Sequence, residues 1–219
     1  MKIALVVEHL DPSRGGKETS TAQLAAELAG RGEQVTIFTQ TANWSHPGVA
    51  IRTLGIRGLL KVRRLGNFVR GVERAVQSDG YDVVHAMLPL PVADVYQLRG
   101  GCLPAQRLAK LRSAGRPEST APARRLPLSA HNYLLKLERR CMADSRMFLL
   151  PVSKMGADEL QRFYGRLDVG VGGDYDDLAL LLATGELPGQ IDSVSVRQVL
   201  VQKKKIEFIK GKELLGLLA

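Results

Sequence analysis

The first forty residues contain the feature that most limits the fold of this chain: a strand, a glycine-containing loop, a helix and a second strand in direct succession. Lys2–Glu8 is a near-continuous apolar run, as expected of a strand buried on both faces of a parallel sheet. The polar segment HLDPSRGGKET follows, and Thr19–Arg31 has the apolar spacing of an amphipathic helix. Gln34–Gln40 is rich in β-branched residues and predicts the next strand. Such a βαβ unit has a right-handed crossover and predicts an α/β fold with a doubly wound parallel sheet.

The same alternation of short apolar runs and longer amphipathic segments continues along the chain. Further strands are predicted at Val49–Leu54, Tyr81–Ala86, Val92–Leu98 and Met147–Val152. Further helices are predicted at Leu59–Gln77, at Tyr133–Met142 and, after Ser153 as the N-cap, through Phe163. Residues 100–128 are predicted to be irregular or partly helical, with a mobile loop at GRPESTAPARRLP.

Length and composition indicate a soluble globular protein with one large domain. The chain has 219 residues, and this length is too short for two full α/β domains. Hydrophobic residues make up 45% of it, which is ordinary for a globular protein with a buried core. No run of eighteen apolar residues predicts a membrane span, and the apolar N-terminus is better explained as a first strand than as a signal peptide. Cys102 and Cys141 have no metal-ligand or redox spacing, so we expect two reduced thiols.

The character of the sequence changes at Asp168, where the Gly- and Asp-rich stretch DVGVGGDYDD begins. We therefore expect a Rossmann-like domain over residues 1–167 and a linker with a short α+β tail, of unassigned role, over residues 168–219. The tail of about fifty residues is shorter than a second nucleotide-binding domain of roughly 100–200 residues.

Positive charge is concentrated between Arg99 and Arg140, where ten basic residues face two acidic ones and the net charge is +8. A block of this sign indicates an anionic partner, either a phosphorylated substrate or a membrane surface; the alternative is a solvated face without a partner. Nucleic acid is disfavoured, because aromatic residues are 5% of the chain and do not interleave with the basic ones. The candidate acceptor- or anion-binding residues in this block are Arg99, Arg107, Arg124 and Arg125.

A candidate phosphate site lies in the loop between the first strand and the first helix. Gly15 and Gly16 would let the backbone approach a ligand, and the N-terminus of the following helix favours negative charge. Lys17, the next residue, joins them as a candidate donor- or phosphate-binding residue. No G-x-G-x-x-G motif is present, which argues against a dinucleotide-binding oxidoreductase. The alternative is a tight turn without a ligand.

Two further polar residues stand in apolar surroundings. His85 lies near the end of a predicted strand, at the carboxyl edge where open α/β sheets bind ligands. Asp94 stands between Ala93 and Val95, an unusual place for a carboxylate without a partner. Both are candidate catalytic residues, with Asp94 orienting or deprotonating an acceptor hydroxyl. The alternatives are a structural histidine and a salt bridge from Asp94 to Arg99.

Five segments, in order along residues 2–165, carry a resemblance to a known family. The opening KIALVVEHLDPSRGGKETSTAQLAAELAGRGEQVTIFT is similar to the start of family-4 glycosyltransferases, apart from Glu33, where the family has His. YDVVHA resembles the D-V-V-H strand of that family. The segments PVADVYQLRGGCLPAQR, YLLKLERRCMAD and FLLPVSKMGADELQRFYG resemble the lipopolysaccharide core glucosyltransferase I subgroup.

The resemblance implies the N-terminal, acceptor-side half of a GT-B fold. It implies retaining transfer of a hexose from a UDP-sugar to a lipopolysaccharide-core or similar, lipid-linked glycan, with no metal and no cofactor besides the nucleotide sugar as co-substrate. Gly15 and Gly16 would lie against the donor diphosphate, His85 against the sugar and Asp94 on the acceptor side. Arg99 and the basic block would meet phosphorylated sugars or anionic headgroups, consistent with a cytoplasmic protein at the inner face of the plasma membrane.

The C-terminal part departs from the family pattern. Where family members continue into a second Rossmann domain with an E-x7-E pair of carboxylates, this chain has LDVGVGGDYDD and no such pair in a comparable setting. We therefore expect a truncated product or half of a split enzyme, with weak donor binding; self-association is left open. The competing hypothesis is a non-catalytic module that binds a phosphorylated glycan or an anionic membrane surface.

Overall fold

The computed structural model describes residues 1–115 and 129–166, and all of these belong to the first of two compact units, which covers residues 1–188. A six-stranded, all-parallel sheet with the order β5-β3-β1-β6-β7-β8 forms its centre. The strands are β1 (Lys2–Val6), β3 (Gln34–Thr39), β5 (Val49–Thr53), β6 (Val83–Ala86), β7 (Val95–Leu98) and β8 (Phe148–Pro151). The predicted α/β, doubly wound, Rossmann-like fold is confirmed. The predicted domain change at residues 167–168 lies where the described residues end, and it stays a prediction.

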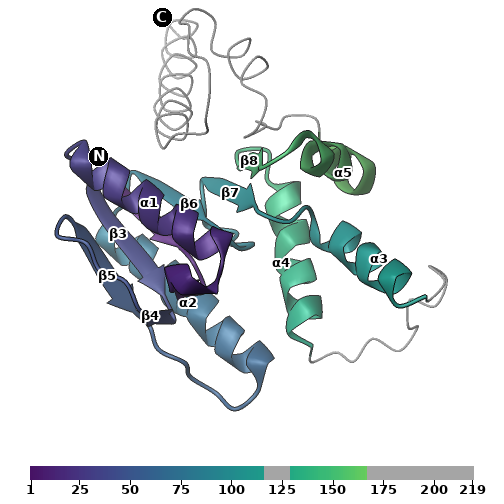
Figure 1. The fold of residues 1–219 in the computed structure, drawn as a ribbon, viewed down its shortest axis with the longest axis horizontal. Helices are drawn as coiled ribbons and strands as arrows, with labels where there is room; N and C mark the ends of the chain where they lie inside the picture. Colours follow the sequence, from purple (N-terminus) through teal and green to yellow (C-terminus); the bar gives the residue numbers. More distant parts are fainter. Residues whose placement is uncertain (116–128, 167–219) are drawn as a thin grey trace, which may run out of the picture. The chain divides into compact units, whose positions relative to one another are not determined.

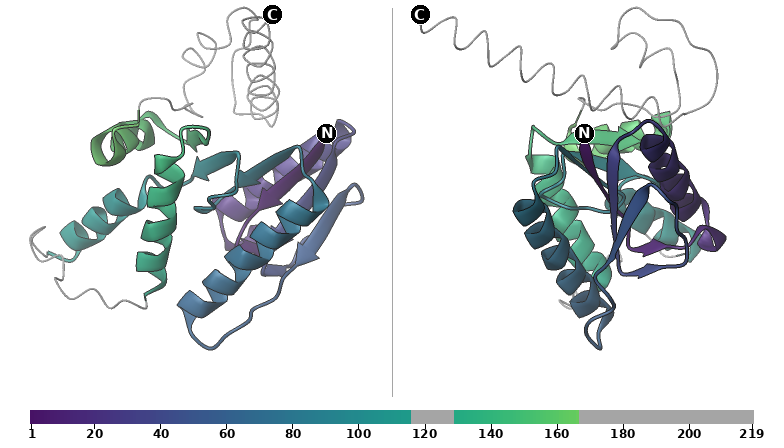
Figure 2. Two further views of the ribbon diagram at one scale, coloured as in Figure 1. Left: turned by 180° about the vertical axis from the view of Figure 1, so that it is seen from behind. Right: turned by 90° about the vertical axis from the view of Figure 1, so that its left-hand side faces the viewer.

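Helices cover both faces of this sheet (Figures 1 and 2). Helix α1 (Gly16–Gly30) connects β1 to β3 on one face, whereas α2 (Lys61–Asp79) and α4 (Ala130–Ala143) pack together on the other face. Two further helices follow β7 and β8, α3 (Leu103–Ser113) and α5 (Lys154–Tyr164). The edge-on view in Figure 2 shows α1 and α2 on opposite sides of the strands.

Side-chain alternation along the strands divides the core into two layers. Ala4 and Val6 belong to the large buried cluster formed with α2 and α4. Ile3 and Leu5 are equally buried but, by the period of two, face α1. His85 is paired with Leu5 in the parallel register, so His85 is on the α1 face as well.

Local sequence explains several element ends. The Ser153 hydroxyl accepts a hydrogen bond from the Gly156 N–H at the start of α5, which confirms the predicted cap. Helix α2 ends at Gly80, whose φ of +62° is left-handed and favours glycine. Helix α3 lies in a segment that sequence left as irregular or partly helical; the predicted mobile loop falls outside the described residues.

A few short elements were not predicted. The strands β2 (His9–Leu10) and β4 (Thr41–Ala42) pair in parallel as a separate two-stranded sheet. The His9 Nδ1 and the Thr41 Oγ1 are 2.8 Å apart in this pair. The 3-10 helix η1 (Pro12–Arg14) lies between β2 and α1, so the loop after β1 is ordered by local hydrogen bonds.

Candidate active site

The loop between β1 and α1 exposes the amino end of a helix at the carboxyl edge of the sheet. The Asp11 carboxylate accepts hydrogen bonds from the N–H of Ser13, at 3.1 Å, and from its hydroxyl, at 2.7 Å, and so stabilises the turn before α1. Gly15 follows with φ +154° and ψ −177°, a conformation that is essentially confined to glycine. No side chain caps α1 at its N-cap, so its first N–H groups have no side-chain acceptor there, while the Glu18 carboxylate in the same turn offsets part of the positive end of the helix dipole.

Gly15 is required by its backbone conformation, whereas Gly16 is required neither by its conformation nor by its packing. A Cβ atom on Gly16 would meet no atom within 4 Å, so packing of the described residues does not require glycine at this position. The open space lies directly beside the first helical N–H groups. This geometry permits a ligand to approach the backbone closely, as the sequence predicted for a phosphate.

Two charged side chains occupy the first turn of α1. The Lys17 Nζ lies 3.8 Å from the Glu18 Oε1, and the Glu18 side chain is 13% exposed. Glu18 also raises the pKa of Arg99, against the larger effect of burial. Glu18 in the first turn of α1 is therefore close enough to Arg99, which follows β7, for their charges to interact.

His85 is completely buried on β6, on the same face of the sheet as α1. Within the described part of the chain, neither its Nδ1 nor its Nε2 has a hydrogen-bond partner. Burial, assisted by the positive charge of Arg99 and opposed by Gln97, lowers the pKa of His85 to about 3. The imidazole is therefore neutral at physiological pH, and because the side chain is 0% exposed, a ligand reaches its nitrogens only if neighbouring side chains move.

Gln97 and Arg99 extend this polar cluster from β7. The Arg99 Nη2 donates a hydrogen bond to the Gln97 Oε1 at 3.2 Å. The Arg99 Nε is buried and has no hydrogen-bond partner among the described residues. Burial lowers the pKa of Arg99, although the guanidinium stays charged. A half-buried cation with a spare donor beside a neutral histidine is suited to an anionic ligand.

Sequence reasoning identified His85 and Arg99 but missed Gln97 and Glu18. The period of two along β7 puts Gln97 on the same face as Arg99, which would have been a usable signal. Glu18 could have been found from its position in the first turn after the glycine pair. Both lie at the carboxyl edge that the topology makes common to β1, β6 and β7.

Asp94 lies at the amino end of β7, level with Val84 in the middle of β6. It immediately precedes β7, and its Oδ2 accepts a hydrogen bond from the backbone N–H of Val84 at 2.8 Å. Arg99 follows the same strand five residues later, which corresponds to about 16 Å of extended chain. The structure thus separates Asp94 from the end of β7 that carries Arg99, and the predicted Asp94–Arg99 ion pair is not formed.

Among the remaining basic candidates, the structure describes Arg107 alone, and it is not part of this cluster. Arg107 lies half-buried on α3 with Lys110, and both cations lower the pKa of His131 on α4, after the larger effect of burial. Arg124 and Arg125 lie outside the described residues.

Three properties of the described residues complete the description. None of their helices is long and apolar enough to cross a membrane. Nowhere in residues 1–115 and 129–166 do three or more His, Cys, Asp or Glu side chains gather as a metal site. Cys102 and Cys141 are free and buried, and burial raises their pKa values to about 11 and about 12.

Comparison with known proteins agrees with the sequence resemblance. The family model for the glycosyl transferase 4-like domain matches residues 15–168. A search of curated protein sequences found no match.

Solved structures with the same fold include two enzymes. WaaG, a glycosyltransferase involved in lipopolysaccharide biosynthesis, has a TM-score of 0.64 and 17% identity, covering 77% of this chain and 44% of WaaG. Sucrose-phosphate synthase from Thermosynechococcus elongatus has a TM-score of 0.53 and 16% identity, covering 84% of this chain and 52% of the synthase chain. The chain therefore spans about half the length of these structures.

Proposed function

The chain belongs to the glycosyl transferase 4-like domain family, and we propose that it forms the acceptor-side half of a retaining hexosyltransferase. The donor would be a UDP-sugar, and the acceptor a lipopolysaccharide-core or similar phosphorylated, lipid-linked glycan. A chain spanning about half of its structural relatives would contribute one wall of the cleft. A partner or further segment would supply most of the donor-binding contacts.

The observation that carries this proposal is the polar cluster at the carboxyl edge, where the Arg99 Nε and both ring nitrogens of His85 have no hydrogen-bond partner among the described residues. The Gly15–Gly16 backbone and the free first turn of α1 suit the donor diphosphate, whose negative charge grows as the bond to the sugar breaks. Lys17 adds a cation beside this turn.

His85 is assigned the contact with the transferred sugar. Because its pKa is about 3, the ring is uncharged at neutral pH and offers one donor nitrogen and one acceptor nitrogen. A neutral, fully buried ring suits a hydroxyl group better than a phosphate. Its role would be to orient the sugar while the diphosphate departs, with the configuration at the anomeric carbon retained.

Arg99 is assigned to an anionic group of donor or acceptor, because its buried Nε lacks a partner among the described residues. Arg107, Arg124 and Arg125 are proposed as weaker, outer contacts to a phosphorylated acceptor. For Asp94 the position at the amino end of β7 favours an indirect role: its carboxylate accepts a hydrogen bond from the Val84 N–H of β6, the strand that carries His85.

A second candidate function is supported by a different observation. The buried, unpartnered Nε of Arg99 and the half-buried Arg107, among the described residues, would hold a phosphorylated glycan or an anionic surface without any transfer step. This non-catalytic binding module uses the same basic residues, and only turnover distinguishes it from the transferase.

The test is acceptor-dependent release of UDP from UDP-glucose by the purified chain, with a panel of phosphorylated core oligosaccharides. A His85→Gln variant should lose release by about 100-fold or more, as expected for a residue that touches the reacting sugar. Asp94→Asn, which keeps an oxygen acceptor for the Val84 N–H, should keep most of the activity.

Three outcomes separate the hypotheses. Release that depends on acceptor and His85 supports the transferase. Acceptor binding without release supports the binding module. Release that survives His85→Gln, or is abolished by Asp94→Asn in a folded protein, contradicts the assignment of these residues.

A further inference from the structure

Two glycines separate Arg99 from the start of α3. Before Arg99 the chain is fixed, because Leu98 ends β7 and its carbonyl accepts a hydrogen bond from the Val152 N–H at 3.3 Å. After Arg99 come Gly100 and Gly101, and Gly101 has φ +75°, a left-handed conformation that favours glycine. Since glycine leaves the backbone more freedom than any other residue, the position of Arg99 depends on how the chain is held beyond this pair.

Two carboxylates from other helices hold the chain directly after the glycines. The Cys102 N–H donates to the Glu159 Oε2 of α5 at 3.1 Å, and the Leu103 N–H donates to the Glu138 Oε2 of α4 at 2.9 Å. In the described part of the chain, the N-cap of α3 makes no side-chain hydrogen bond of its own, and its first turn contains no acidic residue. Negative charge near a helix N-terminus is stabilising, so the two glutamates replace a cap that α3 lacks.

Glu159 also packs against the glycine segment itself. A Cβ atom on Gly101 would collide with the Glu159 carboxylate, so this carboxylate lies against the Gly101 backbone. The Cys102 Sγ lies 4.0 Å from the Glu159 carbonyl oxygen, and the Gln106 Nε2 donates to the Gly101 carbonyl at 2.9 Å. Contacts from α3 and α5 therefore fix the chain at residues 101 and 102.

Helix α5, which carries Glu159, is attached to α4. The Tyr164 hydroxyl donates to the Glu138 carboxylate at 2.7 Å. The Arg166 guanidinium, just after the helix, donates to the carbonyl oxygens of Met142 and Asp144 at 2.9 and 3.0 Å. A carboxylate on a helix that is held in this way has a defined position, so it can fix a backbone N–H.

The Arg99 guanidinium gains from a fixed backbone, because its side-chain contacts are few. Its Nη2 donates to the Gln97 Oε1 at 3.2 Å, and its Nε is buried with no hydrogen-bond partner among the described residues. A long side chain loses rotamer freedom when it binds a ligand, and the loss is smaller when the side chain is already held in the binding position. Anion affinity at Arg99 should therefore depend on the anchor at residues 101 and 102.

We propose that Glu159 is a positioning residue for Arg99: by fixing the backbone at Gly101 and Cys102, its carboxylate holds the Arg99 guanidinium where it meets an anion. The inference rests on the proposed function, because that function assigns an anionic group of the donor or acceptor to Arg99. Glu159 touches no ligand in this role, and it makes anion binding depend on the position of α5.

The experiment is a double-mutant cycle on anion binding by the full chain, measured by titration calorimetry with UDP and with glucose 6-phosphate. Arg99→Gln should weaken binding of at least one probe roughly 30-fold, the loss expected for a charge-assisted hydrogen bond. Glu159→Ala should weaken binding of the same probe roughly tenfold. In the Arg99→Gln background, Glu159→Ala should change binding by less than about twofold, because the guanidinium that it positions is then absent.

The direction of the Glu159→Ala effect separates positioning from charge. Loss of a carboxylate by itself strengthens anion binding, so weaker binding identifies the loss of the anchor. Asp158→Asn removes the exposed neighbouring carboxylate on α5 and should not weaken binding. Glu159→Gln keeps an oxygen that can accept from the Cys102 N–H, and it should stay within about threefold of the parent.

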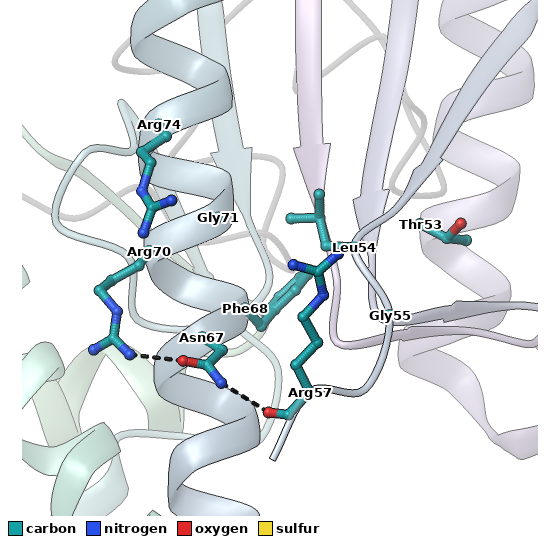
Figure 3. A pocket seen from close by; sticks show the side chains of 9 residues that line it. All are labelled: Thr53, Leu54, Gly55, Arg57, Asn67, Phe68, Arg70, Gly71 and Arg74. Carbon is teal, nitrogen blue, oxygen red and sulfur yellow. Dashed lines mark hydrogen bonds between the residues drawn. The ribbon is translucent and has the colours of Figure 1, made fainter.

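Two further variants control for stability and for net charge. Ser153→Ala removes the N-cap of α5, which lowers the melting temperature but should leave anion affinity unchanged. Arg74→Gln removes a guanidinium from a surface pocket of about 370 Å³ between the segment after β5 and α2 (Figure 3). Because α2 and α1 cover opposite faces of the sheet, this variant should keep anion affinity within about twofold of the parent.

Three results would overturn the positioning role, and they differ in what they say about the transferase site. Unchanged binding in Glu159→Ala, with a loss in Arg99→Gln, leaves the anion site at Arg99 intact. Equal losses from Glu159→Ala in the parent and in the Arg99→Gln background would show that Glu159 acts independently of Arg99. Unchanged binding of both probes in Arg99→Gln would contradict the assignment of the anion to Arg99 itself.

Discussion

The carboxylate of Glu138, buried in α4, accepts a hydrogen bond from the backbone N–H of Leu103, the first residue of α3, at 2.9 Å. The hydroxyls of Tyr96 on β7 and Tyr164 on α5 donate to the same carboxylate at 3.0 and 2.7 Å. Burial raises the pKa of Glu138, against the effect of these three donors. One side chain thus connects α3, α4, α5 and the strand that leads to Arg99.

Glu138→Leu should be severely destabilising, because it leaves three donors without an acceptor in a buried environment. With about 1–3 kcal/mol for each unsatisfied group, we expect a loss of at least ~3 kcal/mol in the free energy of unfolding, measured by urea titration. Glu138→Gln retains one acceptor oxygen and should cost about 1 kcal/mol. Equal stability of the Leu and Gln variants would show that the hydrogen bonds contribute little.

The buried His85 predicts acid sensitivity. Its pKa is about 3 in the folded protein and 6.5 in an unfolded chain, so below pH 6.5 the unfolded state binds a proton that the folded state does not. Stability from this residue is complete above pH 6.5 and falls as the pH decreases towards 3. Between pH 7.5 and pH 5 the parent should lose about 2 kcal/mol more than His85→Gln in urea unfolding. Parallel pH profiles for the two proteins would contradict the low pKa.

The two glycines before α1 should respond differently to alanine. Gly15 has φ +154°, so Gly15→Ala should cost about 1–3 kcal/mol of stability. At Gly16 the added methyl group meets nothing within 4 Å, so Gly16→Ala should change stability by less than ~0.5 kcal/mol.

If a diphosphate does approach this backbone, Gly16→Ala should nevertheless weaken UDP binding, which calorimetry can measure. Lys110→Gln on α3 serves as a control with unchanged UDP affinity. A Gly16→Ala variant with full stability and full UDP affinity would remove the loop from the donor site.

The two thiols should be unreactive in the folded protein. Cys102 and Cys141 are buried, and burial raises their pKa values to about 11 and about 12, well above the 8.5 of a free thiol. At pH 8 a disulfide reagent such as DTNB should label them only at the rate of unfolding, and rapidly in denaturant. Fast labelling of either native thiol would show that its surroundings open readily.

The sequence was sufficient to predict the parallel sheet, because uninterrupted apolar strands alternate with amphipathic helices from Lys2 onwards. The Gly15 loop and His85 were likewise correctly placed at the carboxyl edge, since both follow from their positions relative to predicted strands. The cap at Ser153 was predicted from a side chain that bonds within its own turn. These features depend on local chemistry that one sequence displays.

The position of Asp94 was not predictable in the same way. The connection from β6 to β7, residues 87–94, contains no helix and returns only as far as the level of Val84 and His85, whereas a parallel pair usually needs a longer crossover. Sequence reasoning began the strand at Val92, but it begins at Val95, so Asp94 lies before it. The Glu138 network was also missed, because its donors come from three elements that only the fold brings together.

The carboxylates of Glu138 and Glu159 accept hydrogen bonds from the backbone at the start of α3, and this limits which substitutions homologues can carry there. Besides the bond from Leu103 to Glu138, the Cys102 N–H donates to Glu159 at 3.1 Å, and a Cβ atom on Gly101 would lie 2.1 Å from that carboxylate. Gly101 also has φ +75°, so any larger residue there is strained and would in addition push the Glu159 carboxylate off the Cys102 N–H. In an alignment of homologues, position 101 should therefore stay glycine wherever position 159 is glutamate.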